Sequence, residues 1–277
     1  MLNIGMVDEI ISKALSEDIG TGDITTASTI PKDQKISGKF IAKEAGVICG
    51  LEVVKKVFEK IDGEIIMIPH VTDGERVNKG DLIAEIKGPA VGVLTGERVA
   101  LNFLQRLSGI STKTAQLLEE VKGTKAKITD TRKTTPGLRV LEKYAVRVGG
   151  GVNHRFNLSD GILIKDNHIK AAGSITNAIA AARKNAPHTL KIEVEVESME
   201  QIEEALEAGA DIIMLDNMGT EEMKKAVARI NGRALVEASG NMGEKDLREV
   251  ADTGVDLISV GALTHTVKAM DISLRFE

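Results

Sequence analysis

The second half of the chain alternates between short apolar runs and amphipathic segments. Strand-like runs occur at 127–130, 161–165, 190–196, 211–216, 233–239 and 255–261. Segments with the apolar spacing of helices lie between most of them, at 138–148, 175–185, 199–209, 221–230 and 244–254. Strand–helix alternation with short turns predicts a parallel sheet, either open or closed into a barrel.

The first half of the chain has a different pattern of apolar and polar residues. Residues 7–17 have helical spacing, and short β-type runs at 36–50, 63–70 and 81–88 are interrupted by a helical segment at 51–61. A long helix is predicted from Gly96 through 97–123, and the alternating segment 264–277 is expected to return as a strand to the first sheet. We therefore predict an N-terminal α+β domain over 1–108, joined by 266–277, and an α/β domain over 109–265.

Composition sets limits on location and class. The 277 residues carry a net charge of −5 and one cysteine, Cys49, so no intrachain disulfide can form. Nothing approaches the roughly 18 continuous apolar residues of a membrane span, and the N-terminus lacks the basic and apolar regions of a signal peptide. These features predict a cytoplasmic protein.

A local concentration of basic residues stands out in this slightly acidic chain. The stretch 128–169 contains nine basic or histidine residues and only four acids. The basic set is Arg132, Lys133, Arg139, Lys143, Arg147, His154, Arg155, Lys165 and His168. Since the chain is nearly devoid of aromatic residues, a small anion suits this patch better than nucleic acid, which needs extended basic faces and stacking aromatics.

The positions of three cations favour a pocket. Lys133, Arg155 and Lys165 lie beside turns or at the end of a short apolar run, not on one face of a helix. The alternative, that they are unrelated surface charges, stays open from the residues alone. In a barrel, however, the carboxyl ends of all the strands meet at one mouth, where such enzymes carry their sites.

The strand ends continue with two carboxylates and two glycine-containing turns. Glu195 and Asp216 are placed to hold ribose hydroxyls or Mg²⁺ beside a diphosphate, whereas Glu193 is at least as easily explained by structural pairing with Lys or Arg. The turn 239–243 is expected to lead directly into a helix whose dipole and N–H groups would face a phosphate; an ordinary helix cap is the alternative. The turn 260–262 follows one unit later.

Two familiar nucleotide-binding signatures are missing. No GxGxxG follows the first strand of the α/β half, which disfavours a dinucleotide-binding fold, and no GxxxxGK[ST] loop is present. A phosphate site, carboxylates for a ribose and a cationic pocket together indicate transfer of phosphoribose to an anionic acceptor.

The run 129–168, TDTRKTTPGLRVLEKYAVRVGGGVNHRFNLSDGILIKDNH, resembles the signature region of the quinolinate phosphoribosyltransferases. The likeness extends from the segment 17–23 to 260–262. It implies an incomplete or irregular α/β barrel of the type II phosphoribosyltransferase kind, with an N-terminal α+β open-sandwich domain. It also implies that phosphoribosyl pyrophosphate and quinolinate are converted to nicotinate mononucleotide, pyrophosphate and CO₂, in NAD biosynthesis.

The resemblance also implies residue roles. Quinolinate would meet Arg98, Thr131, Arg132, Lys133, His154, Arg155 and Lys165. Phosphoribosyl pyrophosphate would meet Glu195, Asp216, Ser239, Gly240, Asn241, Val260, Gly261 and Ala262. The catalytic set would be Lys133, Lys165, Glu195 and Asp216, with Mg²⁺ held near the two acids. Arg98 would reach the pocket of a partner subunit in a homodimer, with a hexamer left open; from the residues alone it is a solvated helix charge.

Three other functions compete with this interpretation. The nearest is a paralogous phosphoribosyltransferase that acts on another pyridine acid. A barrel isomerase or aldolase for phosphosugars would need a defined lysine or acid–base pair and fewer cations. The segment 71–88 is similar to half of a biotinyl or lipoyl carrier, but it offers no convincing exposed lysine in a hairpin turn.

Overall fold

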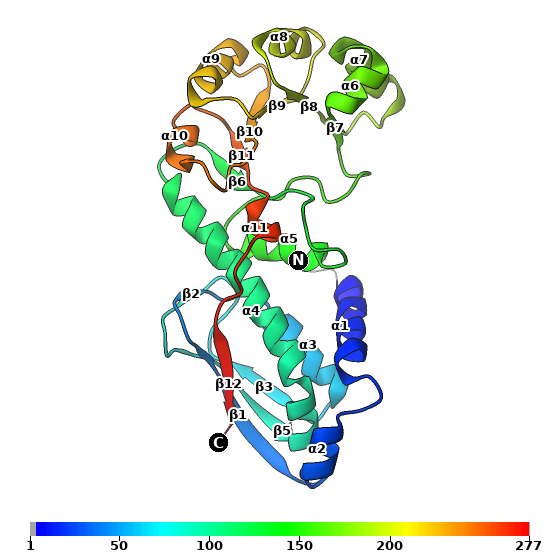
Figure 1. Cartoon of the computed structure of the whole chain (residues 1–277), viewed down its shortest axis with the longest axis vertical. Coiled ribbons are helices and arrows are strands. Elements are labelled where there is room, and N and C mark those ends of the chain that lie inside the picture. Colours follow the sequence, from blue (N-terminus) through cyan, green and yellow to red (C-terminus); the bar gives the residue numbers. More distant parts are fainter. Residues whose placement is uncertain (1–3, 277) are drawn as a thin grey trace. The chain divides into compact units, whose positions relative to one another are not determined.

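Parallel strands of the second half form a single six-stranded sheet in the computed structural model, which describes residues 4–276 (Figure 1). The strands are β6 (Lys127–Thr129), β7 (Ile162–Ile164), β8 (Ile192–Val196), β9 (Ile212–Asp216), β10 (Leu235–Ser239) and β11 (Leu257–Ser259). Their order is β6-β11-β10-β9-β8-β7, and every neighbouring pair is parallel. Among the described residues, β6 and β7 form no ladder with each other, so the sheet stays open.

Helices follow the strands of this sheet. They are α6 (Asp166–Ala172), α7 (Ile175–Asn185), α8 (Met199–Glu207), α9 (Thr220–Ile230), α10 (Leu247–Ala251) and α11 (Ala262–His265). Figure 1 shows α7, α8 and α9 side by side along the outside of the strands. Val194, Val196 and Ile213 are fully buried beneath these helices, because a parallel strand is covered on both faces.

The sheet arranges inward side chains in layers. The register places Glu195 opposite Met214, and Met214 opposite Glu237. Asp216 lies opposite Ser239 one layer nearer the carboxyl ends of the strands. Glu193 lies one layer deeper than Glu195, since alternate residues of a strand share a face. Asp216 is therefore the acid nearest the mouth and Glu193 the deepest, with Glu195 and Glu237 at the level between them.

A second compact unit contains an antiparallel sheet with strand order β12-β1-β5-β3. Its strands are β1 (Lys35–Ala42), β3 (Ile66–Pro69), β5 (Leu82–Pro89) and β12 (Ile272–Phe276), beside the small pair β2 (Gly46–Val47) and β4 (Arg76–Val77). The helices are α1 (Ile4–Ile19), α2 (Ile24–Thr29), α3 (Leu51–Ile61), α4 (Ala90–Glu120) and α5 (Arg139–Val148). The predicted fold class, an antiparallel α+β part and a parallel α/β part, is confirmed.

Contacts between residues divide the chain into two compact units, and each unit consists of more than one segment of the chain. One unit comprises 1–115, 135–150 and 266–277, and the other comprises 116–134 and 151–265. β12 pairs antiparallel with β1 in the first unit, with Leu274 opposite Phe40. The sequence-based domain limits remain a proposal beside this division. No helix in the described range 4–276 is both long and apolar enough to cross a membrane.

The long helix begins earlier than its sequence predicts. It starts at Ala90 instead of Gly96 and therefore contains Gly92 and Gly96, which lower helix propensity. The packing explains both glycines: a Cβ on Gly96 would lie 2.6 Å from Ile61 Cδ1, and one on Gly92 would lie 3.0 Å from Ile65 Cδ1. Three short helices, α2, α6 and α11, were not predicted, and the helix predicted at 244–254 is confined to Leu247–Ala251.

Candidate active site

A pocket of about 540 Å³ lies at the carboxyl ends of the parallel strands. Its lining brings together eleven of the residues predicted for the site: Thr131, Arg132, Lys133, His154, Arg155, Lys165, Glu195, Asp216, Ser239, Gly240 and Asn241. Five further residues line it that the sequence did not single out: Leu163, Met214, Asn217, Glu237 and Ser259. All of these residues belong to the unit of the parallel sheet.

The remaining predicted residues lie elsewhere. Arg98 is exposed on α4 in the other unit. Val260 is fully buried, and its N–H donates to the carbonyl of Thr129 at 2.9 Å. Gly261 lies against a pocket side chain, because a Cβ on it would be 3.0 Å from Lys133 Cδ. Ala262 begins α11.

Arg155 presents a guanidinium that the protein satisfies only in part. Its Nη1 donates to the carbonyl of Gly161 at 3.0 Å, while its buried Nε has no hydrogen-bond partner. Burial and the nearby charge of Arg132 lower the pKa of Arg155, and the charge of Glu193 opposes that shift. Two guanidinium groups that disfavour each other in a pocket form a site for an anion, which would relieve both costs.

Lys165 joins the cationic and acidic sides of the pocket. It follows β7, and its ammonium group forms an ion pair with the carboxylate of Glu195 on β8. Its backbone N–H donates to His168 Nδ1 at 2.9 Å, which caps the start of α6. The short strand and the cap therefore fix where the lysine side chain leaves the backbone.

Glu195 and Asp216 meet the requirement for a pair of ribose or metal ligands. They lie on the same face of neighbouring strands, offset by one layer, and both line the pocket. Asp216 Oδ2 accepts a hydrogen bond from Asn217 Nδ2 at 2.7 Å. Hard cations such as Mg²⁺ prefer carboxylate and other oxygen ligands, so the donor set suits that ion.

The loops after β9 and β10 interlock. Gly240 has φ +96°, and a Cβ there would lie 2.2 Å from Asn217 Oδ1. Asn217 and Asn241 have positive φ values of 56° and 51°, and the Asn217 N–H donates to the Ser239 carbonyl at 3.1 Å. Asparagine tolerates this region better than other side chains, which is the signal that could have identified Asn217.

The predicted helix directly after 239–243 is wrong. A turn occupies the intervening residues, and α10 begins only at Leu247 with Asp246 as its N-cap. The Asp246 side chain accepts from the N–H groups of Arg248 and Glu249, so those donors are used by the protein itself. A phosphate in this pocket would therefore depend on the loop backbone and on nearby cations, not on the dipole of α10.

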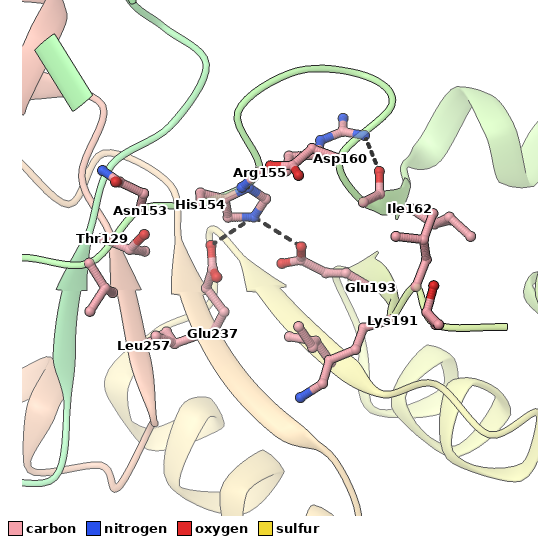
Figure 2. A pocket seen from close by; sticks show the side chains of 15 residues that line it. Thr129, Asn153, His154, Arg155, Asp160, Ile162, Lys191, Glu193, Glu237 and Leu257 are labelled. Atoms are coloured by element: carbon pink, nitrogen blue, oxygen red, sulfur yellow. Dashed lines mark hydrogen bonds and ion pairs between the residues drawn. The ribbon is translucent and has the colours of Figure 1, made fainter. Parts of the chain in front are cut away.

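Beneath the mouth lies a second pocket of about 410 Å³, shown in Figure 2. His154, Arg155 and Glu237 line both pockets, so they form the partition between them. Glu193 Oε2 lies 2.9 Å from His154 Nε2, and Glu237 Oε1 lies 3.9 Å from the same nitrogen. The Lys or Arg partner considered for Glu193 is thus replaced by a histidine.

These three side chains are also spaced like metal ligands. Within residues 4–276, His154, Glu193 and Glu237 form the one group of three such donors close enough to hold an ion. The tentative pair of Glu195 and Asp216 belongs to no such group of three. Glu237 could have been noticed in the sequence, because it is a lone carboxylate in the otherwise apolar strand 235–238.

Comparisons with known proteins agree across the whole chain. The family model described as quinolinate phosphoribosyl transferase, C-terminal domain, matches residues 110–275, and the corresponding N-terminal domain model matches 23–108. A probable nicotinate-nucleotide pyrophosphorylase (carboxylating) of Bacillus subtilis is 46% identical over 99% of this chain and 94% of that protein. The Mycobacterium leprae nicotinate-nucleotide pyrophosphorylase (carboxylating) is 45% identical, over 96% and 95%.

A solved structure gives the same result in three dimensions. The nicotinate-nucleotide pyrophosphorylase from Francisella tularensis is 40% identical, with a TM-score of 0.96 over 100% of this chain and 98% of that one. The match of the N-terminal family model to 23–108 removes the support for a biotinyl or lipoyl carrier at 71–88.

Replacement of Gly240 tests the interlocked loops. We expect Gly240→Ala to destabilise the protein by more than Gly209→Ala, which serves as the matched control. Gly209 also has a positive φ, +79°, but a Cβ there would meet nothing within 4 Å. The control should cost roughly 1 kcal/mol from backbone strain alone, and Gly240→Ala roughly 2–4 kcal/mol in thermal or urea unfolding. Equal losses would mean that Asn217 moves aside freely.

The environment of Glu237 predicts that the stability of the folded protein depends on pH. Burial, followed by the charge of Glu193, raises the pKa of Glu237 from 4.5 to about 7. The folded protein therefore keeps a proton that the unfolded chain loses, so stability falls as pH rises from 4.5 to about 7 and then levels. Glu237→Gln should remove this fall in stability, because glutamine does not titrate.

The measurement is the melting temperature of wild type minus that of Glu237→Gln across this pH range. We expect the difference to decrease steadily and to flatten above the upper limit. Glu197→Gln, an exposed acid at the end of the same sheet, is the control and should show no such trend. A constant difference for Glu237→Gln would contradict the raised pKa.

Proposed function

Because the chain belongs to the quinolinate phosphoribosyl transferase family, we propose that the pocket at the carboxyl ends of β6–β11 is its active site. The enzyme is a decarboxylating pentosyltransferase. It transfers phosphoribose from phosphoribosyl pyrophosphate to quinolinate and gives nicotinate mononucleotide, pyrophosphate and CO₂ for NAD biosynthesis. The pocket residues divide between the two substrates.

The observation that carries the assignment is the pair of guanidinium groups at Arg132 and Arg155. Each disfavours the other in a partly desolvated pocket, and Arg155 Nε has no protein partner. Quinolinate brings two adjacent carboxylates, and guanidinium groups bind carboxylates through two parallel hydrogen bonds. We assign the quinolinate site to these arginines together with Lys133, Lys165, Thr131 and His154.

The opposite side of the pocket suits phosphoribosyl pyrophosphate. Glu195 and Asp216 would face the ribose hydroxyls and the Mg²⁺ that accompanies the diphosphate. Ser239, Gly240 and Asn241 would hold the 5-phosphate through the loop backbone, with Val260, Gly261 and Ala262 in the neighbouring turn. Gly261 supports this role because its bare Cα leaves room for the side chain of Lys133, which lines the pocket.

The reaction follows from this opposition of charges. The quinolinate ring nitrogen attacks the anomeric carbon as pyrophosphate leaves. A Mg²⁺ ion held by Glu195 and Asp216 would neutralise part of the charge of that leaving group. Positive charge develops on the ribose ring, where Glu195 and Asp216 stabilise it. The positive charge on the quaternised nitrogen then stabilises the electron pair that stays on the adjacent ring carbon as CO₂ departs, and that carbon takes up a proton in place of the lost carboxylate. No covalent intermediate with the enzyme is needed.

The test of function is an assay with quinolinate, phosphoribosyl pyrophosphate and Mg²⁺ that follows CO₂ and the mononucleotide together. Equal amounts of the two products are expected. Nicotinate in place of quinolinate is the control for a paralogue that uses another pyridine acid, and a faster reaction with nicotinate would favour that paralogue. A cytoplasmic location is part of the same proposal.

Arg132→Lys separates charge from geometry. The substitution keeps the positive charge but loses the two-pronged fit to a carboxylate. We expect the KM for quinolinate to rise by roughly 5- to 150-fold, equivalent to 1–3 kcal/mol, while the KM for phosphoribosyl pyrophosphate changes little. An unchanged affinity for quinolinate would remove Arg132 from the substrate site.

Shared active sites are the proposed role of Arg98. The exposed side chain of Arg98 would complete the pocket of a partner subunit in a homodimer. Arg98→Ala and Lys165→Ala should each inactivate the enzyme. Mixed subunits should recover activity, because one pocket of the heterodimer then has every residue intact. Heterodimers demonstrated by mass spectrometry that stay inactive would rule out the shared site.

A further inference from the structure

The two ring nitrogens of His154 have different partners. Nδ1 accepts a hydrogen bond from the backbone N–H of Arg155, with an N–N distance of 2.8 Å. Nε2 lies 2.9 Å from Glu193 Oε2 and points toward the carboxylates on β8 and β10, as Figure 2 shows. A backbone amide always donates, so Nδ1 is the unprotonated nitrogen and Nε2 bears the hydrogen.

Electrostatics and hydrogen bonding disagree about the charge of this ring. Two neighbouring carboxylates would ordinarily favour a doubly protonated imidazolium. A hydrogen on Nδ1, however, would face the Arg155 N–H across 2.8 Å and would leave that amide without its acceptor. The conflict is eased if one acid carries a proton. Burial beside Glu193 favours this for Glu237, whose pKa is raised to about 7.

The surroundings of Glu237 are consistent with one proton in the cluster. Glu193 on β8 and Asp130 after β6 oppose its ionisation, while His154 and the Ser259 hydroxyl on β11 favour it. Glu193 and Glu237 are 5% and 1% exposed, and Oε1 of each is buried without a hydrogen-bond partner. Two ionised carboxylates in this position would share the single nearby nitrogen of His154, which is costly in a buried site.

We infer that His154 acts as a neutral imidazole with its hydrogen on Nε2, and that Glu193 and Glu237 are positioning residues that hold this tautomer and thereby aim Arg155 into the pocket. This inference deepens the proposed function and rests on it for the quinolinate site. It assigns no direct substrate contact to either acid. The positive charge offered to quinolinate then comes from arginine and lysine side chains, not from the histidine.

Several hydrogen bonds fix the backbone between His154 and Arg155. Asp130, which is fully buried, accepts from the His154 N–H at 2.9 Å and from Asn153 Nδ2 at 2.6 Å. The His154 ring is then fixed from below by Glu193, and its Nδ1 fixes the next amide. The backbone of Arg155 is therefore oriented before its side chain begins.

A metal ion is the main alternative for this cluster. Coordination by Nε2 requires that this nitrogen lose its hydrogen, and the neutral ring would then carry one on Nδ1. That hydrogen would oppose the Arg155 amide in the manner described above. The existing hydrogen bond thus favours a proton over a metal at the position between His154, Glu193 and Glu237.

Nitrogen NMR of histidine-labelled protein reads the tautomer without depending on activity. We expect the His154 signals, assigned with His154→Gln, to show an unprotonated Nδ1 and a protonated Nε2 at neutral pH. Two protonated nitrogens would overturn the inference. So would loss of the hydrogen from Nε2 on addition of stoichiometric Zn²⁺ in the absence of substrate, which would indicate a metal bound at this nitrogen.

Two substitutions of one residue separate a hydrogen-bond acceptor from a charge. Glu193→Gln keeps an oxygen that accepts from Nε2–H, whereas Glu193→Leu does not. The KM for quinolinate should rise by less than about 3-fold in the first variant and by at least about 10-fold in the second, with little change for phosphoribosyl pyrophosphate. Equal losses in both variants would mean that an ion pair is required, and no loss in Glu193→Leu would remove the positioning role.

Glu197→Leu is the matched control, since Glu197 is exposed just beyond the end of β8, and it should leave both KM values unchanged. If Glu193→Leu fails to fold, the NMR result and Glu193→Gln still decide the question. If the wild-type protein shows no quinolinate activity, the proposed function fails, while the tautomer measured by NMR stands or falls separately.

Discussion

Buried carboxylates inside the parallel sheet are the constraint on which the site depends. Asp130, Glu193 and Glu237 are 0%, 5% and 1% exposed, and a buried acid needs a hydrogen-bond donor, a cation or a proton. One segment, 153–155, supplies donors to Asp130 and Glu193 from an amide side chain, a backbone N–H and an imidazole. The basic loop is therefore attached to the core through polar contacts. Its guanidinium emerges at a fixed place for the same reason.

Along β8, depth separates the acid that pairs with His154 from the acid that faces the pocket. Glu193 and Glu195 share a face of β8 and differ by one layer, yet the deeper acid pairs with a histidine and the outer one with Lys165 in the pocket. Glu195 and Lys165 neutralise each other across the division between the proposed ribose and quinolinate sides. A quinolinate carboxylate would compete for the lysine and thus leave Glu195 to face the developing positive charge. Binding of the acceptor and preparation of the acidic side would in this way be coupled electrostatically.

The sequence predicted the parts of this site that follow from strand direction. Parallel strands end at one edge of a sheet, so Arg132, Lys165, Glu195, Asp216 and Ser239 could be placed at one mouth before any coordinates, and all of them line the pocket. Features that depend on tertiary packing could not be predicted from the sequence. Asn217 matters because its positive φ and its side chain fix the position of Gly240. A glycine occurs at position 96 inside a helix because Ile61 leaves no room there for a side chain. The helix after the 239–243 turn was misplaced because the intervening turn and the cap at Asp246 have no periodic signal.

Glu237 shows why residue type alone gives an incomplete account of a site built on this open sheet. A lone acid in an apolar strand is ambiguous in sequence, since alternation says only which face it occupies. The protonation state of Glu237 depends on its neighbours, which are set by the pairing of β10 with β9 and by the position of the 153–155 segment. These neighbours are Glu193 and the imidazole of His154, whose Nε2 hydrogen is already donated to Glu193. An acid in that position is forced toward its neutral form, and its neutrality in turn permits a neutral histidine. The anion-binding character of the mouth then belongs to side chains that stay charged throughout the physiological pH range.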